Sequence, residues 1–94
     1  MLRQYLSRQG WHIAKESVLR DGKFLYTIME VRWQPDAARL TDAQCYFSPA
    51  LLENRTDALK EYYDRIVEGL RLAVTHQNDA EKAAILKELE ALEL

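Results

Sequence analysis

An Asp-Gly pair between two runs of β-branched and aromatic residues constrains the fold of this chain more than any other feature. The runs are residues 11–20 and 23–33, and Asp21-Gly22 joins them. Such a pair fits the tight turn that the right-handed twist of two antiparallel strands requires. The sequence therefore predicts a β-hairpin with Asp21 and Gly22 as its turn.

A two-residue turn at this point also predicts which side chains share a face of the hairpin. Leu19 is expected opposite Phe24, and Ser17 opposite Tyr26. One face would carry Trp11, Ile13, Lys15, Leu19, Phe24, Tyr26, Ile28 and Arg32. The other would carry His12, Ala14, Val18, Leu25, Met29, Val31 and Trp33. Both faces are largely apolar, so we expect each to be covered, either by this chain or by a second protomer.

The rest of the chain has mainly helical patterns. Residues 2–9 predict a short helix that ends before Gly10, and a long apolar stripe predicts a main helix over about 56–76. Ser48-Pro49 is typical of a helix start, and Asn78-x-x-Glu81 predicts the start of a C-terminal helix. Between these, residues 43–47 alternate as a third strand would, whereas Thr41-x-x-Gln44 would instead suit a helix capping box.

These elements predict an α+β fold in a single domain over residues 1–94. A small antiparallel β-meander, with the hairpin and a possible third strand, would pack against the long amphipathic helix. A short N-terminal helix and a C-terminal helix would complete it. The chain carries no apolar run of the roughly 18–20 residues that a membrane helix needs. We therefore expect a cytoplasmic protein that has no membrane partner.

The sequence contains no recognisable catalytic, cofactor or metal motif, and no motif is specific enough to name a family. His12 and His76 have no ligand at metal-binding spacing, and the lone Cys45 lies among core-like residues. The three glycines, Gly10, Gly22 and Gly69, cannot form a phosphate-cradling loop. The prediction is that the chain is not an enzyme and binds no cofactor.

A row of carboxylates is the sharpest charge pattern. It comprises Asp57, Glu61, Asp64 and Glu68, all on one side of the main helix. Such a row attracts a protein with a basic surface. Alternatively it is a solvated face, in which Glu61 pairs with Arg65 and Glu68 with Arg71.

The hairpin offers a second candidate surface. It combines Trp11, Phe24 and Tyr26 with Lys15 and Arg32, in a half of the chain where residues 1–40 hold seven Lys/Arg against four Asp/Glu. Aromatic rings stack on unpaired bases while cations meet phosphates, so this face suits single-stranded nucleic acid. The alternative is that the rings pack under a helix or in a homodimer interface.

From these patterns we predict a small acidic, non-enzymatic protein-binding module, a regulator or inhibitor that acts through the acidic row, the aromatic face or both. The alternative prediction is a single-stranded nucleic-acid-binding protein that uses the hairpin face. The expected partner is another protein or a second copy of this chain, with nucleic acid as the less favoured choice.

Overall fold

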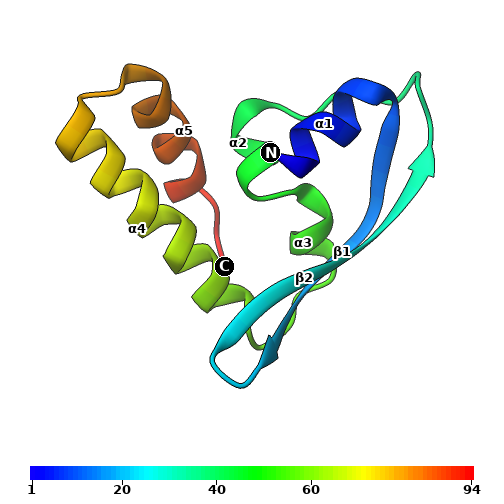
Figure 1. The fold of residues 1–94 in the computed structure, drawn as a ribbon, viewed down its shortest axis with the longest axis horizontal. Helices are drawn as coiled ribbons and strands as arrows, with labels where there is room; N and C mark the ends of the chain where they lie inside the picture. Colours follow the sequence, from blue (N-terminus) through cyan, green and yellow to red (C-terminus); the bar gives the residue numbers. More distant parts are fainter.

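Five helices and one hairpin make up the fold, and the computed structural model describes residues 1–94 throughout. In chain order they are α1 (Leu2–Gln9), β1 (Trp11–Asp21), β2 (Phe24–Trp33), α2 (Asp42–Tyr46), α3 (Pro49–Glu53), α4 (Leu59–Gln77) and α5 (Ala80–Glu90). Figure 1 shows the helices gathered on one side of the hairpin, with α2 and α3 between α1 and the α4–α5 pair. The predicted α+β class, with a long helix packed against a hairpin, is confirmed.

The hairpin forms, but its turn lies one residue later than predicted. Asp21 pairs with Phe24, and Leu19 with Tyr26, so Gly22 and Lys23 are the two turn residues. Only Gly22 of the two has a positive φ, of 60°. Turns that take glycine at their first central position have this pattern, which explains the shift. Because the register moves by two, side chains near the turn keep their predicted faces.

A β-bulge changes the faces at the other end of the hairpin. The register shifts between Ile13 and Lys15, so Ala14 is an extra residue on β1. Trp11 and Ile13 therefore pair with Trp33 and Val31 on the inner face, and His12 moves to the outer face. The prediction for these positions is wrong, because an inserted residue reverses the alternation beyond it.

The segment over residues 43–47 is helical, so the possible third strand is absent and the sheet has two strands. The Thr41 hydroxyl accepts from the Gln44 amide, and the Gln44 side chain accepts from the Thr41 amide. This reciprocal pair satisfies amides at the start of α2 that would otherwise lack partners, and it confirms the capping-box interpretation. Ser48-Pro49 starts α3 as predicted.

The core lies where α3, α4 and α5 meet β1. Its buried members are Val18, Ala43, Phe47, Leu51, Leu59, Val67, Leu70 and Leu89. The ring of Phe47 lies edge-on to Tyr63, whose hydroxyl donates to the Leu89 carbonyl at 2.7 Å. The predicted stripe of α4 therefore faces the core and fixes α5. Gly69 of α4 faces open space and makes no close-packed contact.

Beside this core lies a buried ion pair that the sequence did not predict. Arg3 of α1 donates to the carboxylate of Glu16 on β1, with a closest distance of 2.7 Å. The same guanidinium donates to the Tyr62 hydroxyl and to two carbonyls at the end of α2, and Ser48 donates to Glu16. No buried side-chain polar atom lacks a partner. The network joins α1, β1, α2, α3 and α4.

Candidate nucleic-acid interface

Two of the four carboxylates of the acidic row are paired with cations of this chain. Glu61 accepts from Arg20 of β1 and from Arg65, and Asp64 accepts from Lys60 at 2.7 Å. Asp57 lies in the turn before α4 rather than in the helix. The expected pair of Glu68 with Arg71 does not form, because Arg71 binds Glu90 of α5 at 2.6 Å.

The outer face of the hairpin collects four of the five residues predicted for the sheet-face site. Lys15, Phe24, Tyr26 and Arg32 lie on it, whereas Trp11 lies on the inner face because of the bulge. Arg32 pairs with Glu30 across 3.1 Å, and both side chains remain at least half exposed. Four of the five residues therefore share one face of the hairpin, and Trp11 does not.

This outer face has two chemically distinct ends. Near the turn it presents an apolar strip made of Leu19, Phe24, Tyr26 and Ile28. Phe24 is 67% exposed, Ile28 57% and Tyr26 46%. At the opposite end His12 and Lys15 lie beside Arg32, all of them exposed. The single surface predicted from the sequence is thus one apolar and one cationic region.

Two further arginines lie outside the strands, one on α1 and one in the loop after β2. Arg8 of α1 and Arg39 of that loop line one small pocket of about 90 Å³, and neither forms an ion pair. The Leu40 amide donates to the Ser7 hydroxyl at 2.9 Å, which holds the loop against α1. We call Arg8, His12, Lys15, Arg32, Trp33 and Arg39 together the basic end.

Trp33 supplies an aromatic surface at the basic end. Its indole is 59% exposed and lies edge-on to Trp11, with the ring centroids 5.2 Å apart. Gly10 lies directly beneath, since an added Cβ there would come within 3.1 Å of the Trp33 ring. The Gln34 amide also donates to the Gly10 carbonyl at 2.9 Å. These contacts hold Trp33 against Trp11 and Gly10 while more than half of the residue stays exposed.

Sequence reasoning missed Arg8 and Arg39, which lie far apart along the chain. The excess of cations over residues 1–40 was the available signal, but it did not distinguish paired from unpaired groups. The structure distinguishes the paired arginines from the unpaired ones. Arg3, Arg20 and Arg32 have carboxylate partners, whereas Arg8 and Arg39 have none. Unpaired arginines with free donors are suited to bind phosphate.

The remaining candidates show no reactive geometry. Burial raises the pKa of the Cys45 thiol, and the nearby Asp42 carboxylate raises that pKa further. A thiol of that kind stays protonated and is a poor nucleophile at neutral pH. His76 is exposed at the end of α4, and no group of three or more His, Cys, Asp or Glu residues could hold a metal ion.

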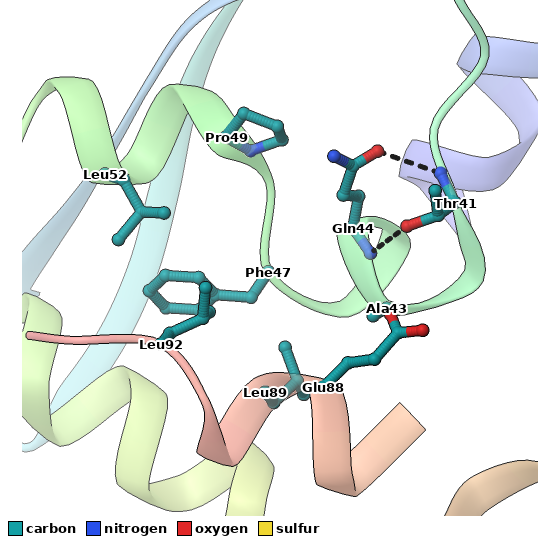
Figure 2. Close-up of a pocket in the computed structure, with 9 residues that line it drawn as sticks. All are labelled: Thr41, Ala43, Gln44, Phe47, Pro49, Leu52, Glu88, Leu89 and Leu92. Carbon is teal, nitrogen blue, oxygen red and sulfur yellow. Dashed lines mark hydrogen bonds between the residues drawn. The ribbon is translucent and has the colours of Figure 1, made fainter. Parts of the chain in front are cut away.

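The pocket drawn in Figure 2 lies between α2, α3 and α5 and has a volume of about 360 Å³. Phe47, Leu52, Leu89 and Leu92 give it a mainly apolar lining. Its Thr41 and Gln44 side chains bond each other's backbone, as the dashed lines show. Glu88 supplies its only charge.

No helix in the chain is both long and apolar enough to cross a bilayer.

The chain was compared with protein families, curated proteins and solved structures. The model of the TrmK family, described as tRNA (adenine(22)-N(1))-methyltransferase, matches residues 1–93. A solved structure titled as an uncharacterized protein from Listeria monocytogenes serotype 4b superposes with a TM-score of 0.63 and 24% sequence identity. The superposition covers 95% of this chain but only 41% of the Listeria chain. None of the curated proteins compared with the chain matches it.

The family match overturns the functional prediction. It names an enzyme family, so the expectations of a non-enzymatic module and of a regulator or inhibitor that acts through protein contacts are wrong. The error arose because the chain carries no catalytic signature of its own. Nucleic acid, the less favoured partner, becomes the plausible one, since the family acts on tRNA. A homodimer remains an untested prediction.

Proposed function

We propose that this chain, which belongs to the TrmK family of tRNA (adenine(22)-N(1))-methyltransferases, serves in tRNA methylation. In this proposal it holds the RNA at its basic end. The family match over residues 1–93 is the observation that carries the proposal. The chain spans less than half of the solved relative, so the tRNA contact is a role for this part of an enzyme.

The chemistry named for the family sets a requirement on the substrate. N1 lies on the Watson–Crick edge of adenine, where it accepts a hydrogen bond in a base pair. An adenine that is to be methylated there must first leave its pair, as bases do in other base-modifying enzymes. Proteins hold such unpaired RNA by stacking bases on aromatic rings and by placing cations against phosphates.

The basic end provides both kinds of contact. Arg8 and Arg39 have no carboxylate partner, Lys15 lies on the outer face of the hairpin, and the exposed Trp33 offers a ring for stacking. Residues 41–94, in contrast, hold six Lys/Arg against eleven Asp/Glu. This charge division would orient an approaching RNA toward α1 and the hairpin and away from α4 and α5.

Methyl transfer also requires a methyl donor, and the residues of this chain do not fit one. None of the three glycines lies where a bound methyl donor would need one. Gly10 lies under Trp33 and Pro35, and a Cβ added at Gly22 or Gly69 would face open space. In the apolar pocket of Figure 2 the Thr41 and Gln44 side chains bond each other's backbone, and every buried polar side-chain atom has a partner within the chain. We therefore assign RNA binding, and no donor site, to these residues.

Fluorescence anisotropy with a labelled tRNA that has adenine at position 22 tests the proposal. We expect binding that weakens as salt rises, since each phosphate contact releases counterions. The double variant Arg8→Ala/Arg39→Ala should bind more weakly, and its slope against log salt should fall by about one unit for each lost contact. The matched control Lys82→Ala/Lys87→Ala removes the same charge from α5 and should bind as the parent does.

Two results would contradict this proposal. One is tRNA affinity that is independent of salt, which would exclude phosphate contacts as its source. The other is an equal loss of affinity in the α5 control, which would indicate a general effect of charge rather than a site at the basic end.

A further inference from the structure

The loop between β2 and α2 carries Arg39 past α1. Residues 34–41 form no helix or strand, and Figure 1 shows this segment passing α1 on its way to α2. The loop is tied at its start, where the Gln34 amide donates to the carbonyl of Gly10 just after α1, at 2.9 Å. It is tied at its end by the capping box of α2. The backbone around Arg39 therefore lies between two fixed ends.

The side chain of Ser7 holds the stretch of loop next to Arg39. Its hydroxyl accepts from the Leu40 amide at 2.9 Å, and both residues are partly buried. No other hydrogen bond joins residues 35–40 to α1. Because Leu40 follows Arg39 directly, this bond fixes the backbone from which the Arg39 side chain extends. Ser7 likewise directly precedes Arg8 in α1, so one contact sets the relative position of the two arginines.

Arg8 and Arg39 line the same pocket, which has a volume of about 90 Å³ and also includes Ser7. Both arginines are exposed and form no ion pair, so their N–H groups can bind an anion. Asp42 is the one carboxylate in the lining, and it is paired with neither arginine. Two cations against one anion leave the lining net positive. Guanidinium groups match the geometry of phosphate oxygens, which suits this pocket to one phosphate of an RNA backbone.

We propose that Ser7 is a positioning residue for the tRNA contact, because it holds Arg39 beside Arg8 so that both meet one phosphate. The inference rests on the proposed function, since it concerns how a part of the basic end is built. Binding loses affinity when it must order a loop or a long side chain, and a loop that is already ordered avoids part of that cost. Without the Ser7 hydroxyl, the RNA itself would have to order the stretch around Arg39.

Fluorescence anisotropy with the labelled tRNA measures this role in the 94-residue chain. Ser7→Ala should weaken binding about fivefold, the fold-change that corresponds to one typical hydrogen bond. Its slope against log salt should fall by about one unit, as in Arg39→Ala, because the same phosphate contact is lost. The double variant Ser7→Ala/Arg39→Ala should bind no more weakly than Arg39→Ala alone. Ser7→Thr keeps the hydroxyl and should bind as the parent does.

Two further measurements separate positioning from folding. Ser17→Ala removes a partly buried hydroxyl from the middle of β1 instead of from the contact with the loop, so affinity and slope should not change. Without RNA, the Leu40 amide should exchange with solvent at least about fivefold faster in Ser7→Ala than in the parent. The amides of β1 and β2 should exchange at the parent's rates in both proteins.

Separate outcomes contradict this inference and the proposed function. Parent-like affinity of Ser7→Ala, when Arg39→Ala binds more weakly, would overturn the positioning role and leave tRNA binding at the basic end intact. So would a further loss of affinity in the double variant, or equal exchange of the Leu40 amide in Ser7→Ala and the parent. Parent-like affinity of Arg39→Ala would instead count against the proposed function, and against this inference with it.

Discussion

Arg3 and Glu16 form the one ion pair of this protein that is shielded from water; in each of the others both side chains are at least 42% exposed. Burial by itself lowers the pKa of Arg3, but hydrogen bonds to Glu16 and Tyr62 outweigh it and raise that pKa. The guanidinium therefore stays charged. A buried pair of this kind contributes little net free energy, yet it is costly to break.

We predict that Arg3→Met lowers the free energy of unfolding by about 3–5 kcal/mol, because it leaves the Glu16 carboxylate buried without its partner. Urea denaturation measures this change. Arg65→Met serves as a control on an exposed pair and should have little effect. The double variant Arg3→Met/Glu16→Leu should be more stable than Arg3→Met alone. If it were less stable, the unpaired carboxylate would not be the cause.

Cys45 gives a prediction for alkaline pH. Its thiol has a raised pKa, so the folded state binds this proton more tightly than the unfolded chain. The resulting stability is complete below the ordinary thiol value of about 8.5 and is lost as pH rises through the raised one. The free energy of unfolding should therefore fall above about pH 8.5 more steeply in the parent than in Cys45→Ala. Parallel curves for the two proteins would contradict this.

At the scale of elements, the hairpin and the starts of α2 and α3 were accessible to sequence reasoning, and the bulge was not. The start of α5 was predicted one residue early, because Asn78 ends α4 in a left-handed conformation and Asp79 caps α5. Gly22 fixed the hairpin because its positive φ is required at one position of a tight turn. The extra residue at Ala14 left no signal, since both faces of β1 carry apolar side chains and either alternation looks reasonable. The apparent strand over 43–47 failed for a related reason: spacing of two in a short apolar run also occurs in a capped helix.

Two glycines in different elements should respond oppositely to alanine. Gly10 has a φ of 99°, and an added Cβ would come within 3.2 Å of the Pro35 backbone. Gly10→Ala should therefore lower the free energy of unfolding by about 1–3 kcal/mol. Gly69 lies inside α4 with open space around it, so Gly69→Ala should raise that free energy by about 0.5–1 kcal/mol. Thermal denaturation of both variants checks the signs, and a shared sign would contradict the account.

At the scale of the whole molecule, the sequence predicted the fold class and the division of charge but not the function. Hydrophobic periodicity is local, so it identified the hairpin and α4. The basic end depends instead on a loop folded back onto α1, which brings together residues as distant as Arg8 and Arg39. The buried pair of Arg3 and Glu16 was missed likewise, because charged residues in a helix and a strand normally face water.

Nuclear magnetic resonance can map where tRNA contacts this chain. Amide chemical shifts of the labelled 94-residue chain are followed during titration with a tRNA that has adenine at position 22. We expect shift changes over residues 8–15 and 32–39, with little change along α4 and along the apolar strip. Changes centred on α4 and α5, or none at any salt concentration, would contradict the assignment of the basic end as the tRNA-binding surface.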